Sequence, residues 1–241
     1  MTNPLYYCLR RWQAAGAAGG SAPVATITHS KNGTFTSNWR GTDQAKLTFD
    51  WGDGSAPGEI TLLGSDTDVP SSHVYSSGVS KTIAIYNNLQ SVSRFFLSTM
   101  FVTEFDLSSL KNIDFFVMAG NPNLTGISSV SKIASCSDIW LNQNGITDVS
   151  PLSNSKATYI ALFDNPITYT QMVWVTRTSG TYRFYSTVTT SGEVDQWLID
   201  LNASNWSNCT IYIGGTNPAP TSAAAAALAG LASRGCTVYT N

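Results

Sequence analysis

Val92-Ser-Arg-Phe-Phe-Leu-Ser-Thr-Met100 is the first of four blocks that decide the fold, and Ile113-Asp-Phe-Phe-Val-Met-Ala-Gly-Asn121 is the second. The third is Cys136-Ser-Asp-Ile-Trp-Leu-Asn-Gln-Asn144, and the fourth is Ala157-Thr-Tyr-Ile-Ala-Leu-Phe-Asp-Asn165. Apolar residues occupy the first, fourth and sixth places of every block, and asparagine occupies the ninth place of the last three. The blocks begin 21, 23 and 21 residues apart, so the chain contains a short repeat.

Each block predicts a short strand, because side chains alternate along a strand and the fourth and sixth places then share one face. A second set of apolar residues follows three of the blocks: Val102/Phe105/Leu110, Leu124/Ile127/Val130 and Ile146/Val149/Leu152. These residues can cover the back of the strands. One repeat cannot bury its own apolar face, whereas stacked repeats can. The spacing therefore predicts strands that stack side by side in one parallel layer.

The blocks fit the pattern L-x-x-L-x-L-x-x-N, with a period inside the range of roughly 20–29 residues, and so the region resembles leucine-rich repeat proteins. The resemblance implies a solenoid in which the side chains of Asn121, Asn144 and Asn165 bond backbone groups of the turn. Met100 takes the place of this asparagine in the first block, which suits an irregular first repeat. The ending from Gly214 to Val238 is similar to the C-terminal cap of bacterial and phage-encoded leucine-rich repeat proteins, and the chain as a whole resembles bacterial and phage BspA-like surface proteins.

The repeat continues beyond the fourth block in a longer form. Strands are predicted over 181–186, 209–213 and 236–239, and helical spacing predicts helices over 191–201 and 221–233. The first helix is expected to carry a serine or threonine cap. The parallel layer is therefore expected to run on to Tyr239 through two repeats backed by helices.

Alternating residues between Val24 and Tyr86 predict several short β-strands. Asp50-Trp-Gly-Asp-Gly54, followed by His73-Val-Tyr75, resembles the turn of the polycystic-kidney-disease-type (PKD-like) module. We therefore expect a mixed, β-rich fold with a small sandwich-like β module before the repeats. The expected division is an attachment segment and linker over 1–23, a PKD-like domain over 24–88, and a leucine-rich repeat domain with its C-terminal cap over 89–241.

The four cysteines, Cys8, Cys136, Cys209 and Cys236, are scattered without C-x-x-C spacing, which argues against a zinc site. Cys209 and Cys236 precede predicted strands by the same offset and are expected as inward neighbours. Buried free thiols are the favoured interpretation, and a disulfide is the alternative.

Charged residues form 12% of the chain, and its net charge of -2 gives no basic surface for nucleic acid. No apolar run is long enough to span a membrane, and the N-terminus does not read as a secretory signal. Calcium could use Asp50, Asp53, Asp66 and Asp68, but D-x-D-x-D-G spacing is missing. We therefore expect no nucleic acid, membrane insertion, cofactor or metal.

Catalysis has little support in the sequence. His29 and His73 are the two histidines, and neither lies beside a catalytic signature. Asp138 and Asp164 could form a carboxylate pair of the kind that glycosidases use, but solvated surface acids are the simpler interpretation. The sequence predicts a protein that is not an enzyme.

Residues that alternate with the buried ones must face the open side of the parallel layer, and many of them are aromatic. Such a surface marks a binding site more often than an accident. The candidate ligand- or partner-binding residues are Phe96, Phe115, Trp140, Tyr159, Phe163, Arg183, Tyr185, Tyr212 and Tyr239. An assembly contact and simple packing within the sheet remain the alternatives.

The function expected from these features is adhesion by a phage virion surface protein, a fibre, tail-tip or capsid-associated protein that engages a host-surface protein or glycan. Its expected attachment to other virion or surface proteins uses the apolar N-terminal residues Leu5, Tyr6, Tyr7, Leu9 and Trp12. A homo-oligomer is possible. The alternatives are a purely structural virion decoration or assembly protein, a secreted or cell-surface bacterial BspA-like adhesin and, third, an enzyme acting on surface polysaccharide.

Overall fold

The computed structural model describes residues 22–64, 66–87, 89–133 and 135–241. The described chain is rich in β-structure, with two sheets and few helices. Leu5, Tyr6, Tyr7, Leu9 and Trp12, the predicted attachment residues, lie outside the described residues, as does Cys8.

The smaller sheet has five antiparallel strands in the order β4-β3-β6-β1-β8. Their bounds are β1 Ala25–His29, β3 Lys46–Asp50, β4 Gly58–Thr61, β6 Lys81–Tyr86 and β8 Val102–Asp106. Strands β1, β3, β4 and β6 match the alternating segments of the sequence. By contrast, β8 comes from the apolar set that follows the first block, and it pairs with β1.

The larger sheet has nine strands in the order β14-β13-β12-β11-β10-β9-β7-β2-β5. Two antiparallel strands at one end, β2 Gly33–Gly41 and β5 Val69–Tyr75, pair with each other, and β2 pairs with β7. The other strands are parallel: β7 Val92–Ser98, β9 Phe115–Ala119, β10 Asp138–Trp140, β11 Tyr159–Ala161, β12 Gly180–Arg183, β13 Cys209–Tyr212 and β14 Thr237–Tyr239. The parallel layer expected from the repeat is therefore present.

Both sheets contain strands from either side of residue 88, the predicted end of the N-terminal module. The nine-stranded sheet takes β2 and β5 from before it, and the five-stranded sheet takes β8 from after it. The two sheets pack face to face, as the contact between the rings of Trp39 and Phe49 at 5.8 Å shows. The sandwich therefore shares its strands with the first repeat, and the proposed domain division stays a prediction.

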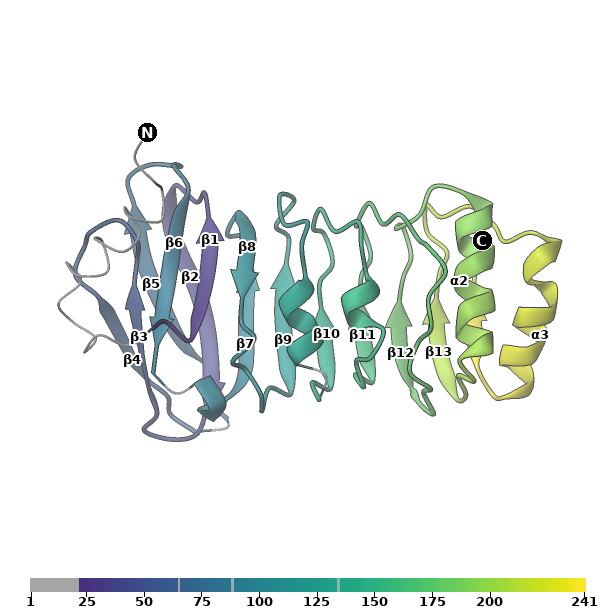
Figure 1. Ribbon diagram of the computed structural model, residues 1–241, viewed down its shortest axis with the longest axis horizontal. Coiled ribbons are helices and arrows are strands. Elements are labelled where there is room, and N and C mark those ends of the chain that lie inside the picture. Colours follow the sequence, from purple (N-terminus) through teal and green to yellow (C-terminus); the bar gives the residue numbers. More distant parts are fainter. Residues whose placement is uncertain (1–21, 65, 88, 134) are drawn as a thin grey trace.

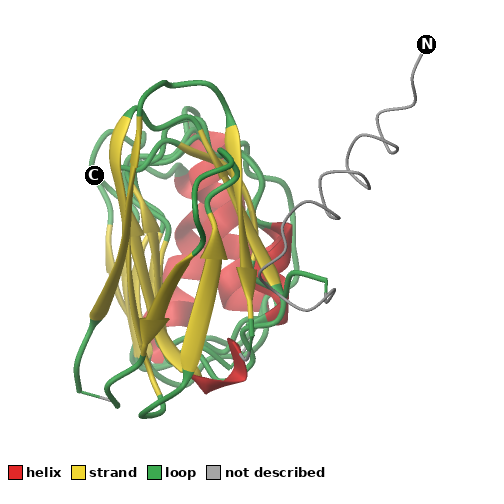
Figure 2. Ribbon diagram, turned by 90° about the vertical axis from the view of Figure 1, so that its left-hand side faces the viewer, coloured by secondary structure: helices red, strands yellow, loops and turns green. Residues whose placement is uncertain are grey.

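Helices continue the second layer beyond β8 (Figure 1). They are η2 Ser128–Lys132, η3 Ser150–Leu152, α2 Ser191–Ala203, η4 Ser222–Ala224 and α3 Ala225–Ser233. A further short helix, η1 Leu89–Ser91, comes between β6 and β7. Figures 1 and 2 together show that η2, η3, α2 and α3 lie on the same side of the nine-stranded sheet as the five-stranded sheet. Within the described ranges, no helix or strand covers the opposite side of β7 to β14, which we call the open face.

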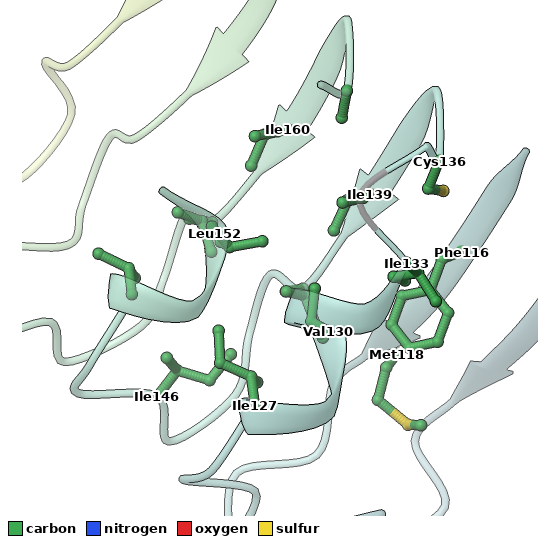
Figure 3. Close-up of a cluster of buried hydrophobic side chains, with 14 of the residues drawn as sticks. Phe116, Met118, Ile127, Val130, Ile133, Cys136, Ile139, Ile146, Leu152 and Ile160 are labelled. Carbon is green, nitrogen blue, oxygen red and sulfur yellow. The ribbon is translucent and has the colours of Figure 1, made fainter. Parts of the chain in front are cut away.

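The core lies between the parallel strands and this second layer (Figure 3). Phe116, Met118, Ile139 and Ile160, from the fourth and sixth places of the blocks, are fully buried. They pack with apolar residues of the covering layer, such as Val130. Burial of a side chain of this size stabilises the fold by about 1.5–3 kcal/mol, so the inward places supply much of the free energy of folding.

The asparagines at the ninth place bond the backbone between successive repeats. Asn144 accepts a hydrogen bond from the backbone N–H of Asn121 at 2.9 Å and donates to the carbonyls of Met118 and Leu141, both at 2.7 Å. Asn121 and Asn165 make equivalent bonds. This confirms the role expected from the resemblance. Asn217, which follows β13, does the same for Thr187 and Val188, and the sequence pattern did not identify it.

The residue before each of these turns adopts a left-handed conformation. The φ angles at the eighth place are +57° at Thr99, +58° at Gln143 and +57° at Asp164, and glycine occupies the equivalent place at Gly120. The N–H of Thr99 then reaches the carbonyl of Ala119 at 3.0 Å, which extends the strand ladder into the turn. The left-handed region is unfavourable for a β-branched residue such as Thr99, so the surrounding hydrogen bonds must hold it there.

The C-terminal elements follow the expected order. Helix α2 begins with a capping box, in which Thr190 and Glu193 bond each other's backbone N–H groups. The predicted helix over 221–233 is a 3₁₀ turn, η4, followed by α3. Cys209 and Cys236 are both buried and free, as the favoured interpretation had it.

His29 is a fully buried histidine between the two sheets of the sandwich. Its Nδ1 accepts the backbone N–H of Lys31 at 3.0 Å, its Nε2 has no hydrogen-bond partner among the described residues, and its ring contacts Phe35 and Tyr75. Burial, together with the nearby His73 and Lys81, lowers the pKa of His29 from 6.5 to about 4. The folded state therefore favours the neutral imidazole.

Replacement of Asn144 by alanine should lower the free energy of unfolding by about 2–4 kcal/mol, because buried backbone groups lose their partners. Asn123→Ala is the matched control, since Asn123 is an exposed asparagine of the preceding repeat, and it should change stability by less than about 0.5 kcal/mol. Urea unfolding followed by circular dichroism measures both. Equal effects of the two substitutions would contradict the role given to the asparagine.

Acidification should destabilise the chain through His29. Its folded pKa lies below its unfolded pKa, so its contribution is complete above pH 6.5 and is lost progressively as the pH falls to about 4. The maximum loss is about 3 kcal/mol, at about 1.4 kcal/mol for each pKa unit.

Unfolding titrations at several pH values between 7 and 4 test this prediction. His29→Gln should reduce the change in the free energy of unfolding between pH 7 and pH 4, because glutamine can still accept a hydrogen bond from the Lys31 N–H but does not titrate. His73→Gln should leave most of the loss at low pH in place, because burial is the largest cause of the lowered His29 pKa and His73 contributes less. If wild type and His29→Gln lose stability in parallel, the histidine is not the sensitive group.

Candidate functional site

The open face is defined by the register of the parallel strands, which have no shift between β7 and β14. One row of paired residues is Phe96, Val117, Trp140, Ala161, Arg183, Tyr212 and Tyr239. The row beside it is Arg94, Phe115, Asp138, Tyr159, Thr181, Thr210 and Thr237. Seven of the nine candidate residues lie in these rows: Phe96, Trp140, Arg183, Tyr212 and Tyr239 in the first, and Phe115 and Tyr159 in the second.

Seven side chains from these two rows form a continuous stack, with one member from each parallel strand. Its order is Arg94, Phe115, Trp140, Tyr159, Arg183, Tyr212 and Tyr239. We call this set the aromatic stack. The Trp140 and Tyr159 rings are 4.7 Å apart and the Tyr212 and Tyr239 rings are 4.8 Å apart, both pairs stacked.

Two arginines are part of the stack. The guanidinium of Arg94 lies 4.2 Å from the centroid of the Phe115 ring, and that of Arg183 lies between Tyr159 and Tyr212 at 5.9 and 5.4 Å. Cation–π contacts of this kind contribute about 0.5–1 kcal/mol at exposed sites. They also hold the arginine side chains in fixed positions on the face.

Phe163 and Tyr185 form a separate stacked pair in the next row, with ring centroids 4.8 Å apart and planes at 9°. Of the nine predicted residues, eight therefore contact at least one other predicted residue. Phe96 is the exception, and it pairs across the strands with Val117 and Asn38. Arg94 belongs to the stack but was not among the predicted residues, although its position in the same row as Phe115 and Tyr159 was the signal that could have found it.

Small side chains between the large ones are covered. Val117 and Ala161 point toward the open face but are 4% and 0% exposed, because their larger neighbours close over them. Trp140 Nε1, Asn142 Oδ1 and Arg183 Nε are also covered, and none has a hydrogen-bond partner among the described residues. A packed aromatic surface with unpaired polar atoms is thus a feature of this face.

Only some of the charged residues of the open face have a partner of opposite charge among the described residues. Asp68 pairs with Arg40 at 2.8 Å and lies 3.9 Å from Arg94. Asp138, half-buried on β10, has no hydrogen bond or ion pair with its carboxylate among the described residues, and burial raises its pKa. Arg183 likewise has no acidic partner. The middle of the face therefore carries one cation and one carboxylate that nothing in the described chain neutralises.

A second polar cluster lies in the turn after β3. The Asp53 carboxylate lies 2.7 Å from His73 Nε2, and the His73 ring stacks on Trp51. Burial alone would raise the pKa of Asp53, but hydrogen bonds from Ser55 and His73 outweigh it and lower that pKa well below its usual value. Ser55 Oγ and Asp53 both approach the same histidine nitrogen, which is not the arrangement of a catalytic triad.

The carboxylates of Asp138 and Asp164, and any group of possible metal ligands, are the other arrangements that could support catalysis or bind a metal. Asp138 pairs with Tyr159 in the register of β10 and β11, whereas Asp164 lies three residues beyond the end of β11, in the left-handed conformation of the turn. The register therefore does not place the two carboxylates opposite each other. In the described ranges, no group of three or more His, Cys, Asp or Glu side chains is placed to hold a metal ion.

None of the helices described is long and apolar enough to be a membrane span.

Comparison with known proteins gave few matches. No family model matches the chain, and no curated protein matches it. Among solved structures, an internalin (inlF) from Listeria monocytogenes is similar to this chain, with 14% sequence identity and a TM-score of 0.38. The alignment covers 63% of this chain and 48% of the internalin chain, so this chain matches about half the length of that protein. The resemblances to BspA-like proteins and to the PKD-like module rest on the sequence motifs alone.

Proposed function

We propose that this protein is a non-enzymatic binding module and that the open face is its contact surface for a protein partner. The observation that carries the proposal is the aromatic stack, which spans seven adjacent strands on a sheet face that the described chain leaves uncovered. Trp, Tyr and Arg are the residues most enriched among the energetic centres of protein interfaces. All the aromatic and arginine members of the stack except Phe115 belong to these types.

The orientation of the rings favours a protein over a glycan as partner. Sugars stack on the faces of aromatic rings, but in the aromatic stack those faces are already occupied by the neighbouring ring or guanidinium. A ligand therefore meets ring edges, tyrosine hydroxyls and guanidinium groups. These groups suit the mixed polar and apolar contacts of a protein interface. Tyr239, the last member of the stack, is 51% exposed.

The motif evidence suggests how the module is built and where it acts. We assign the ladder from β7 to β14 to a leucine-rich repeat solenoid of the BspA-like kind, preceded by a PKD-like module. We place the protein on the surface of a phage virion, where residues 1–23 attach it to other proteins of the particle and the open face engages a host-surface protein. The two alternative functions use the same contact surface. A bacterial cell-surface or secreted adhesin would bind its partner through it, and a structural decoration protein would use it for assembly.

The combined substitution Trp140→Ala and Tyr212→Ala should lower binding to host cells at least tenfold, because it removes two members of the stack. Ile199→Ala is the control, since Ile199 is an exposed apolar residue of α2 on the covered side. Fluorescence-labelled protein on a panel of bacterial cells measures binding, and thermal unfolding checks the fold.

Two arms of this experiment separate partner classes. Protease treatment of the cells should abolish binding, whereas glycosidase treatment should not. Binding that survives the double substitution at full strength would remove the open face as the contact surface. Loss of binding after glycosidase alone would replace the protein partner by a glycan.

The attachment segment can be tested separately from the open face. A reporter fused to residues 1–23 should associate with purified virions, and replacement of Leu5, Tyr6, Tyr7, Leu9 and Trp12 by serine should prevent it. Co-sedimentation measures the association. A wild-type fusion that stays in the supernatant contradicts the attachment role.

A further inference from the structure

Arg183 differs from every other arginine that the structure describes. Arg40 and Arg94 approach the carboxylate of Asp68. Arg177 donates to the carbonyl of Ala157, and Arg234 donates to Asn202 and to the carbonyl of Trp206. In the described ranges, Arg183 is the one arginine whose guanidinium has neither a hydrogen bond nor an ion pair.

The guanidinium of Arg183 is nevertheless held in place. Tyr159 and Tyr212 flank it from the two neighbouring strands, with ring centroids 5.9 and 5.4 Å from Cζ. A flexible side chain usually loses much conformational entropy when it binds, but an arginine held between two rings has already lost part of it. The arrangement is therefore preorganised for a ligand.

The chemistry of the ligand follows from this geometry. A guanidinium presents N–H donors in a fixed plane that matches the two oxygens of a carboxylate. The donors of Arg183 are unmatched at the centre of an apolar surface, where a charge-assisted hydrogen bond is stronger than in open solvent. On the other side of Tyr159, the uncompensated carboxylate of Asp138 repels a second acid. An acidic group of the partner is thus directed to β12 and away from β10.

Building on the proposed protein-binding function, we propose that Arg183 is the specificity-determining residue of the open face and receives an aspartate or glutamate side chain of the bound protein segment. The partner is accordingly an acidic segment whose apolar residues lie along the aromatic stack. Its carboxylate occupies the acceptor position that the chain itself leaves empty at Arg183.

A selection of displayed peptides tests this inference. Random 12-residue peptides displayed on phage are first depleted on immobilised Trp140→Ala protein and then selected on wild type. The same selection is repeated on Arg183→Gln, on Arg183→Glu and on Lys132→Gln. The last variant is the control, because Lys132 is an exposed lysine of η2 on the covered side. Thermal unfolding verifies that each variant is folded.

Peptides selected on wild type should be enriched several-fold in aspartate and glutamate. This enrichment should disappear on Arg183→Gln, change to lysine and arginine on Arg183→Glu, and persist on Lys132→Gln. In a chosen peptide, replacement of the acidic residue by its amide should weaken binding to wild type about tenfold and leave binding to Arg183→Gln unchanged.

Two results would overturn the inference in distinguishable ways. Peptides that require Trp140 but show no acidic enrichment, or keep it on Arg183→Gln, would remove the role of Arg183 and leave the binding face intact. A selection in which no peptide depends on Trp140 would contradict the proposed function of the open face, and this inference with it.

Discussion

The unshifted register of the parallel strands is the constraint on which the rest of the structure depends. Neighbouring strands in a sheet lie about 4.7–4.9 Å apart, which is also a favourable separation for stacked rings. The stacked pairs Trp140–Tyr159, Phe163–Tyr185 and Tyr212–Tyr239 have centroid separations of 4.7, 4.8 and 4.8 Å. A slip of one residue would turn each ring to the covered side, so register determines the core and the open face together.

Two devices keep this register. The asparagines bond backbone groups of adjacent repeats, and the left-handed residue before them turns the chain out of the strand. The second layer adds a further restraint, because β8 pairs with β1 while its repeat contributes β7 to the larger sheet. The sandwich thus provides the first repeat with partners in both layers and covers the end of the parallel ladder with β2 and β5.

The periodic parts of the structure could be predicted from the sequence, and the parts without a period could not. The repeat spacing predicts that Ile139 and Leu141 are buried and that Asn144 bonds the turn, as the structure shows. Strand β5, containing Ser71 and His73, has no clear alternation of apolar residues, and the pairing of β8 with β1 joins segments more than 70 residues apart. Likewise, no periodic pattern in the sequence predicts that Arg177 is buried between Tyr182 and Trp206.

The strand alternation separates the residues that maintain the fold from those that meet a partner. In each repeat, the residues at places four and six lie in the core and the residue at place nine bonds the turn. The residue at the fifth place and its outward neighbours do neither in most repeats. Substitutions at Trp140, Arg183 or Tyr212 can therefore change what the surface recognises at a modest cost in stability. Such a scaffold can diversify its ligand through few mutations, and insertion of a whole repeat would lengthen the contact surface by one strand.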